Sequence, residues 1–254
     1  MSSLVLSIIV PAYNEQENIR PTLAAIMPRL RAEGIPFEML VVNDNSHDRT
    51  ADIVTEIMRT NPEVRLVNRT PPGGFGRAVR TGLAHFAGDA VVLVMADLSD
   101  DPTDIVVYYR KLEEGYDCVF GSRFMRGSTV SEYPRGKLVV NRMVNRMLQM
   151  LFWTRHNDLT NAFKAYRANV IRGIMPLYAC HFNITIELSL SALIRGYRIA
   201  SVPVNWYGRT WGQSNLRLRQ MGRRYLATLL KIWFERVLIL DDLLAEKNAD
   251  RPGG

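Results

Sequence analysis

Residues 4–15 read LVLSIIVPAYNE, an apolar run that stops at a proline and passes into a polar loop. Aliphatic and β-branched side chains fill almost every position from 4 to 10, which is typical of a strand buried on both faces of a sheet. No basic segment precedes the run, so it does not have the form of a signal peptide. The stretch therefore predicts the first strand of a parallel sheet, with polar side chains at its carboxyl end.

The same pattern continues along the first half of the chain, where short apolar runs alternate with helical patterns. The expected strands are residues 4–10, 37–42, 64–68, 90–95 and 117–120. The expected helices are residues 17–32, 48–60, 75–86 and 104–114. Buried strands separated by helices predict an α/β fold with a mostly parallel sheet flanked by helices.

Polar clusters follow three of these strands, at residues 13–15, 43–46 and 97–101. The ligands of open α/β sheets bind outside the carboxyl ends of the strands. These clusters therefore predict a binding site along one edge of the sheet.

The second half of the chain carries amphipathic helices. A helix over residues 137–153 has an apolar stripe made of Val140, Val144, Met147 and Leu151. A helix near residues 183–195 and a strand over residues 199–204 follow. The last long helix has its apolar stripe at Leu226, Leu230, Trp233, Val237, Leu240 and Leu244.

Composition narrows the class of partner. The 254-residue chain has a formal net charge of +7, which favours anionic partners such as phosphorylated ligands or an anionic membrane surface. No nucleic-acid motif is present, so nucleic acid is not expected among them. Cys118 and Cys180 are too few and too far apart for a disulfide framework, which indicates a reducing, cytoplasmic setting.

Three N-terminal segments carry a family resemblance: IIVPAYNE at residues 8–15, VVNDNS at residues 41–46 and PGGFGRA at residues 72–78. They resemble the opening strand and loop, the DDGS motif and the glycine-rich turn of family 2 glycosyltransferases. The resemblance implies the GT-A fold, a Rossmann-like sheet that binds a nucleotide-sugar donor. It places the donor nucleotide against Pro11, Tyr13, Glu15, Asn43, Asp44, Gly76, Arg77 and Ala96.

Residues 94–99 read VMADLS and align with the family's metal-binding DxD motif. Met95 replaces the first aspartate, and Asp97 remains. A thioether is a poor ligand for a hard cation, whereas one carboxylate with substrate phosphates can hold Mg²⁺. We therefore expect Mg²⁺ or Mn²⁺ at Asp97 with altered metal dependence, while Asp100 or Asp101 either compensates or caps the next helix.

Later segments narrow the resemblance further. FGSRF at residues 120–124, DLTNAFKAYR at 158–167 and the block at 209–214 resemble segments of dolichyl-phosphate mannose synthases and their polyprenyl-phosphate relatives. This implies an inverting enzyme that moves a sugar from a GDP- or UDP-sugar to a polyprenyl phosphate. The implied catalytic residues are Asp97, Arg123 and Arg209, and the implied acceptor-phosphate residues are Arg123, Arg135, Arg209 and Ser214.

The resemblance implies a GT-A catalytic domain over residues 1–215. An amphipathic helical appendage is expected over 216–247 and a disordered tail over 248–254. The amphipathic helices either lie on an anionic membrane surface, near a polyprenyl phosphate or other lipid acceptor, or pack on the domain or on a second copy. No segment is apolar enough for a membrane span, so we expect a cytoplasmic protein that associates peripherally with the membrane.

Two other functions stay open. The enzyme could act on another lipid or on a saccharide hydroxyl, which needs a general base, and Asp100, Asp101 and Glu187 are the candidates. Alternatively, Met95 marks a protein that binds a nucleotide-sugar but has lost catalysis. A polyprenyl phosphate needs no such base, because it is already ionised at neutral pH.

Overall fold

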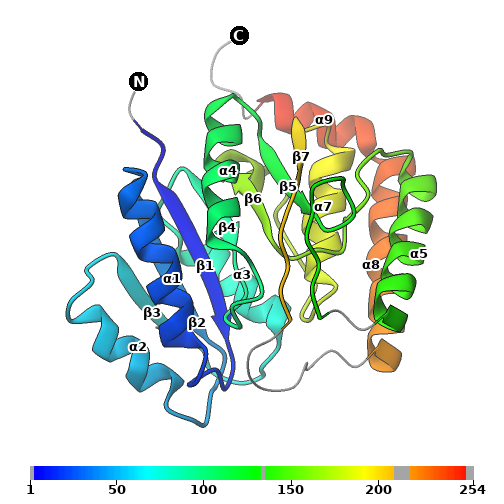
Figure 1. Cartoon of the computed structure of the whole chain (residues 1–254). Coiled ribbons are helices and arrows are strands. Elements are labelled where there is room, and N and C mark those ends of the chain that lie inside the picture. The colour runs from blue at the N-terminus through cyan, green and yellow to red at the C-terminus, as the bar shows by residue number, and fades with distance from the viewer. Residues whose placement is uncertain (1–2, 133–134, 209–217, 250–254) are drawn as a thin grey trace.

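A seven-stranded sheet lies at the centre of the computed structural model, which describes residues 3–132, 135–208 and 218–249 (Figure 1). The strands lie in the order β3-β2-β1-β4-β6-β5-β7. Their bounds are β1 Leu6–Ala12, β2 Phe37–Asn43, β3 Val64–Asn68, β4 Ala90–Leu93, β5 Cys118–Ser122, β6 Lys164–Arg167 and β7 Ile199–Pro203. The pairs β1–β2, β1–β4, β2–β3 and β5–β7 are parallel, whereas β6 is antiparallel to β4 and β5. The mostly parallel α/β sheet expected from the sequence is confirmed.

Helices cover both faces of this sheet, as Figure 1 shows. Their bounds are α1 Ile19–Ala32, α2 Thr50–Met58, α3 Phe75–His85, α4 Pro102–Glu113, α5 Arg135–Phe152, α6 Ala168–Gly173, α7 Ile184–Ile194, α8 Leu218–Leu238 and α9 Leu240–Ala249. Helices α1, α2 and α4 enclose one core, which contains Ile19, Val54 and Ile105. Helices α3, α5, α6, α7 and α8 enclose the other, which contains Leu148 and Ile232. Both faces are therefore buried, and this explains why the parallel strands read as continuous apolar runs.

The sequence patterns did not predict β6 and α6. Strand β6 has only four residues, KAYR, and its charged ends hide the apolar pattern of a buried strand. The predicted last helix is two helices, because α8 ends at Leu238 and α9 begins at Leu240. Asp241 and Asp242 in the first turn of α9 favour a new helix start there.

Helix α8 packs on the sheet domain through one of its faces. The Ile232 side chain is fully buried, and Asn183 Nδ2 donates to Thr228 Oγ1 at 2.9 Å, which joins α7's start to α8. Helix α9 continues to Ala249, two residues into the expected tail, and residues 250–254 lie outside the described part. The boundary between a catalytic domain and a helical appendage stays a prediction.

The remaining faces of α5 and α8 expose apolar side chains. We call these the apolar faces of the two helices: Val140, Met143, Met147 and Met150 on α5, and Leu226, Leu230, Phe234 and Val237 on α8. The helices lie side by side in Figure 1. Arg236 Nη1 of α8 donates to the Leu151 carbonyl oxygen of α5 at 3.4 Å. Within the described residues, no helix is both long enough and apolar enough to cross a membrane.

His156 lies buried between the loop after α5 and strand β7. Its Nδ1 is 2.7 Å from Ser201 Oγ, and its ring meets the Phe120 ring edge-on. Burial, together with the charges of Arg155 and Lys164, lowers the pKa of His156 from 6.5 to about 4. The imidazole is therefore neutral in the folded protein at pH values where the unfolded chain is already protonated.

This difference predicts a pH-dependent stability. Between pH 6.5 and about 4 the unfolded chain binds the extra proton, so the free energy of unfolding falls as the pH falls through this window. We expect His156→Gln to remove about 2 kcal/mol of that fall, measured by urea unfolding at a series of pH values. Parallel pH profiles for the wild type and the variant would contradict this role for His156.

Candidate active site

The loops that follow β1 and β2 are joined by hydrogen bonds at the carboxyl edge of the sheet. The Asn14 N–H donates to Ser46 Oγ at 3.0 Å, and the His47 N–H donates to Asn14 Oδ1 at 2.9 Å. The Glu15 N–H donates to Thr50 Oγ1 at 2.9 Å. The two polar clusters predicted from the sequence therefore lie together and form one rigid rim.

Most of the predicted donor residues in and beside this rim are buried. Pro11 is a buried residue of β1, Glu15 is 8% exposed and its carboxylate accepts from Asn18 Nδ2 at 2.6 Å. Ala96 is also buried, and its carbonyl oxygen accepts from Thr22 Oγ1. Tyr13 is 43% exposed. Of these side chains, Tyr13 is the one best placed to stack on a nucleobase.

Asn43 and Asp44 organise the end of β2. Asn43 Nδ2 donates to Asn68 Oδ1 at 2.8 Å, and Asn43 Oδ1 accepts from the Ser46 N–H. Asparagine can donate and accept at once, whereas the aspartate usual at this position only accepts. Asp44 pairs with Arg69 and accepts from the Gly74 N–H at 2.6 Å. Sequence reasoning missed Arg69, for which no motif gave a signal.

The glycine-rich turn is needed for close packing. A side chain at Gly74 would meet the Cys180 carbonyl oxygen at 2.4 Å, and one at Gly76 would meet the Ala179 carbonyl oxygen at 2.6 Å. Gly74 also has φ 149°, which L residues rarely adopt. Arg77 donates from Nη1 to the Gly73 carbonyl oxygen and lines a cavity on the side of α8.

The segment aligned with the DxD motif, in which Met95 replaces the first aspartate, follows β4. Asp97 is 6% exposed, and its Oδ1 accepts from the Ser99 N–H at 3.2 Å. Asp100 Oδ2 accepts from the Met95 N–H, and burial, with help from the charge of Asp97, raises the pKa of Asp100 to about 7. Asp101 caps α4, since its Oδ1 accepts from the Thr103 N–H at 2.9 Å. The capping alternative is therefore confirmed for Asp101.

The donor set of this segment fits one kind of metal site. No group of three metal-ligating side chains occurs among the described residues. Asp97 supplies one carboxylate, and Met95 supplies a thioether that a hard cation does not favour. Mg²⁺ or Mn²⁺ that keeps its waters and binds substrate phosphates fits such a site, whereas an ion held by the protein alone does not.

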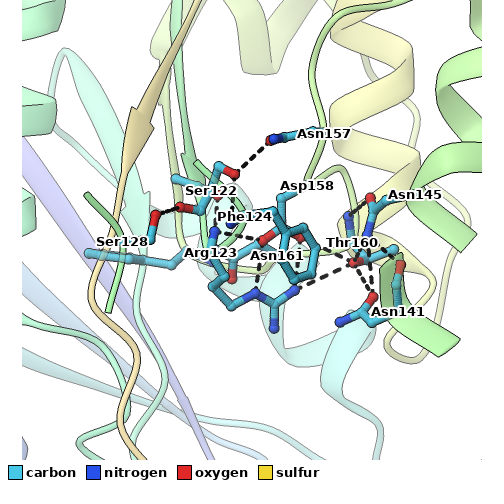
Figure 2. Close-up of polar contacts among 12 residues, drawn as sticks. Ser122, Arg123, Phe124, Ser128, Asn141, Asn145, Asn157, Asp158, Thr160 and Asn161 are labelled. Carbon is cyan, nitrogen blue, oxygen red and sulfur yellow. Dashed lines mark hydrogen bonds and ion pairs between the residues drawn. The ribbon is translucent and has the colours of Figure 1, made fainter. Parts of the chain in front are cut away.

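Arg123 follows β5 and is held by Asp158 (Figure 2). The Arg123 Nε and Nη2 atoms each donate to one Asp158 oxygen at 2.8 Å, and the Arg123 N–H donates to the same carboxylate. The side chains are 9% and 1% exposed. Burial tends to raise the pKa of Asp158, but the Arg123 charge outweighs it, so the carboxyl pKa is lowered. The arginine predicted to bind phosphate is thus fixed in place.

A polar network extends from this pair into α5, as Figure 2 shows. Arg123 Nη2 approaches Thr160 Oγ1 at 3.5 Å, and Thr160 Oγ1 donates to Asn141 Oδ1 at 2.7 Å. Asn145 Nδ2 donates to Thr160 Oγ1, and Asn145 Oδ1 accepts from the Leu159 N–H. Asparagine is a poor helix former, and residues four apart lie on the same face of a helix. The Asn141 and Asn145 pair could therefore have indicated a polar contact made by this face of α5.

Lys164 completes the support behind the Asp158 loop. Its Nζ donates to the carbonyl oxygens of Leu159 and Asn161 and to Ser189 Oγ at 2.6 to 2.8 Å. Burial lowers the pKa of Lys164 to about 7, against the opposing effect of Asp158. Sequence reasoning also missed this lysine, which binds the loop to α7.

Three predicted acceptor residues lack described side chains. Arg209 and Ser214 lie outside the described residues, and Arg135 begins α5 without a described side chain. Their roles stay predictions. Glu187, an alternative base, is 1% exposed and accepts from the N–H groups of Tyr178 and Ala179 and from Lys231 Nζ. The Glu187 carboxylate therefore has a structural role.

Comparison with known proteins indicates the family and the fold. Residues 7–175 match the model of "Glycosyl transferase family 2". The chain is 30% identical over 221 residues to a dolichol-phosphate mannosyltransferase of Pyrococcus furiosus, covering 84% of this chain and 59% of the relative. It is 29% identical over 215 residues to a polyprenol monophosphomannose synthase of Mycolicibacterium smegmatis, covering 82% and 80%. The chain therefore spans less than two thirds of the Pyrococcus protein.

Solved structures with the same fold include glucosyl-3-phosphoglycerate synthase from Mycobacterium tuberculosis. Its complex with Mn²⁺, UDP and glucosyl-3-phosphoglycerate has a TM-score of 0.67 and 24% identity, covering 90% of this chain and 80% of that one. Its complex with Mg²⁺ and UDP has the same TM-score at 23% identity, covering 90% and 79%. These likenesses confirm the GT-A fold.

The buried ion pair gives a stability prediction. Asp158→Asn leaves the Arg123 charge buried without its carboxylate, so we expect the free energy of unfolding to fall by about 3 kcal/mol in urea denaturation. The matched control is Glu56→Gln, which breaks the exposed pairs of Glu56 with Arg20 and Arg49 and is expected to change stability by less than about 1 kcal/mol. Equal effects of the two substitutions would show that the Arg123 pair has no special role.

Proposed function

The chain belongs to glycosyl transferase family 2, and we propose that it transfers a sugar from a nucleotide-sugar to a polyprenyl phosphate, with inversion at the anomeric carbon. The Pyrococcus and Mycolicibacterium relatives are named as mannose-transferring enzymes with lipid phosphate acceptors, which supports this acceptor class. Further support comes from the positions of Asp97 and Arg123 in this chain.

The observation that carries the proposal is the placement of opposite charges on one edge of the sheet. Asp97 follows β4, and Arg123 follows β5, and both strands pair with β6. The charge of Arg123 also reaches Asp100 and lowers its pKa against the larger effect of burial. A metal–diphosphate group at Asp97 and an acceptor phosphate near Arg123 would therefore be close enough to react.

In the proposed reaction, the acceptor is its own nucleophile. A phosphate oxygen forms a bond to the anomeric carbon while the bond from that carbon to the donor diphosphate breaks, and the nucleoside diphosphate leaves with its electron pair. No general base is needed, because the acceptor phosphate is ionised. The protein must bring two anions together, and the fixed guanidinium of Arg123 offsets their repulsion.

The rim after β1 and β2 would hold the nucleoside, with Tyr13 against the base. Asp97 would hold the divalent cation. Such a cation, when bound, offsets the charge that develops on the departing diphosphate. The Mycobacterium structures with Mn²⁺ or Mg²⁺ and UDP support a divalent cation in this fold.

The apolar faces of α5 and α8 would place the active site at a membrane surface. Arg142 and Arg146 on α5 and Arg223 on α8 are exposed beside these faces. Apolar side chains that enter the interface and arginines that meet anionic headgroups are the usual means of peripheral binding. A lipid acceptor is found at such a surface.

A hydroxyl acceptor is the second candidate, and Asp100 is the observation in its favour. This carboxyl is buried, is three residues from Asp97, and has a pKa near 7, which suits a general base. Of the other candidate bases, Asp101 caps α4 and Glu187 accepts from Lys231 Nζ. Asp100→Asn would spare transfer to a phosphate but slow transfer to a hydroxyl by about 100-fold or more.

Transfer itself is tested with labelled GDP-mannose and UDP-glucose and a polyprenyl phosphate in detergent. We expect a lipid product that mild acid hydrolyses, loss of transfer in EDTA, and recovery with Mg²⁺ or Mn²⁺. Asp97→Asn should slow transfer by about 100-fold, whereas Asp52→Asn, on the exposed face of α2, should not. An acid-stable product would replace the phosphate acceptor by a hydroxyl. Donor binding without transfer would favour the non-catalytic alternative.

Membrane binding is tested by flotation with phosphatidylglycerol vesicles. Replacing both Leu230 and Phe234 with serine removes two half-exposed apolar side chains, so we expect vesicle binding to weaken about tenfold. Val107→Ser on α4 is the control, because Val107 is 41% exposed on the other layer of helices. Equal binding of all three proteins would remove α8 from the membrane contact.

A further inference from the structure

The chain that leaves β7 lies beside the loop that leaves β4, although β6 and β5 separate these two strands in the sheet. We call residues 204–207 the β7 extension. The Tyr207 N–H donates to the Ser99 carbonyl oxygen at 3.0 Å, and the Ser99 N–H donates to Asp97 Oδ1 at 3.2 Å. The β7 extension therefore contacts the segment that carries the proposed metal-binding carboxylate.

The β7 extension also contacts the loop that follows Arg123. The Trp206 N–H donates to the Thr129 carbonyl oxygen at 2.8 Å. The neighbouring Ser128 Oγ donates to the Ser122 carbonyl oxygen at 2.6 Å, as Figure 2 shows, and this bond ties the loop to the residue before Arg123. One short segment thus contacts both the donor side and the acceptor side of the proposed reaction.

Asn205, in the β7 extension, bridges the two sides with a single side chain. Its Nδ2 donates to Asp101 Oδ2 at 3.2 Å, and its Oδ1 accepts from the Thr129 N–H at 3.2 Å. Its backbone N–H donates to Asp104 Oδ2 at 2.9 Å, which fixes the β7 extension beside the first turn of α4. An amide donates and accepts at once, so neither an ionised carboxylate nor an aliphatic side chain of the same size can make both side-chain contacts.

The fold of α4 does not depend on the Asn205 side chain. Asp101 caps this helix through Oδ1, which accepts from the Thr103 N–H and hydroxyl, and the Tyr207 side chain also hydrogen-bonds to the Asp101 carboxylate. The bond to Asp104 uses the Asn205 backbone, which a change of side chain retains. Loss of the Asn205 side chain should therefore leave the fold intact and free the two loops to move relative to each other.

We propose that Asn205 is a positioning residue for the transfer reaction proposed above, on which this role rests. It sets the distance between the metal–diphosphate group at Asp97 and the acceptor phosphate near Arg123. The two reacting groups must be held at the right separation, and a misplacement of about 1 Å costs about 100-fold in rate. Asn205 acts through Asp101 and Thr129 and does not itself contact the reacting atoms.

A positioning role predicts a split between kcat and KM. Asn205→Leu keeps the volume of the side chain and removes both of its hydrogen bonds. We expect kcat for sugar transfer to fall by about tenfold or more, while KM for the nucleotide-sugar and for the polyprenyl phosphate changes by less than about threefold. A rise in either KM with an unchanged kcat would overturn this role.

The matched control is Asn61→Leu. Asn61 is half-buried like Asn205, and it lies before β3, at the opposite edge of the sheet. Its Nδ2 donates to the Ile57 carbonyl oxygen and its Oδ1 accepts from Arg31 Nη2, each at 3.0 Å. Asn61→Leu should change neither kcat nor KM, and an equal fall of kcat in both variants would overturn the role of Asn205.

An exchange of the two side chains tests the bridge itself. Asn205→Asp alone places a second carboxylate against Asp101 and Asp104, and Asp101→Asn alone turns two NH₂ groups toward each other. Combined, the new amide at position 101 donates to the new carboxylate at position 205, which still accepts from the Thr129 N–H. Asparagine also caps a helix as well as aspartate does. We expect each single variant to lower kcat and the double variant to recover it to within about threefold of the wild type. A double variant as slow as the slower single variant would contradict the bridge.

Amide hydrogen exchange gives a readout that needs no sugar transfer. The Thr129 N–H should exchange about fivefold faster in Asn205→Leu, because it loses its acceptor, and at the wild-type rate in the double variant and in Asn61→Leu. Equal exchange in the wild type and in Asn205→Leu would show that the bridge is absent. A wild type that shows the expected exchange but transfers no sugar would instead overturn the proposed function, and the positioning role with it.

Discussion

The pairing of Arg123 with Asp158 is the contact on which the end of β5, the loop before β6 and the start of α5 depend. Both groups are almost fully buried, so each would be costly without the other. The pair joins the end of β5 to the loop before β6, and Thr160 extends the connection to Asn141 and Asn145 of α5. One interaction thus sets the position of the cationic group, of a loop and of a helix.

The direction of β6 explains why the loop before it lies near the candidate site. The candidate site lies at the carboxyl ends of the parallel strands. The loop that precedes a parallel strand therefore lies at the opposite edge of the sheet. Strand β6 runs antiparallel to β4 and β5, so the loop before it, residues 158–163, arrives at the active edge instead. The antiparallel strand therefore lets Asp158 reach Arg123.

The sequence predicted the parallel half of the fold because both faces of those strands are buried and their apolar runs are continuous. It predicted the rim at residues 13–15 and 43–46, since polar residues directly after buried parallel strands lie where open α/β sheets bind their ligands. It did not predict β6, whose buried Lys164 resembles a surface residue in sequence. It also missed Arg69, Asn145 and Lys164, because each has a partner at least 15 residues away in the chain (Asp44, Thr160 and Ser189), and no sequence pattern pairs such residues.

Gly74 has contacts on two sides. Its N–H donates to Asp44 in the rim after β1 and β2, and its Cα side packs on the Cys180 carbonyl oxygen of the loop before α7. A residue shared in this way couples two equilibria. If a shift of the loop of residues 178–183 moves the turn and changes the affinity of the rim for a ligand by some factor, that ligand must change the equilibrium of the loop by the same factor. Such reciprocity would make the glycine turn a thermodynamic link between the rim and the loop that precedes α7.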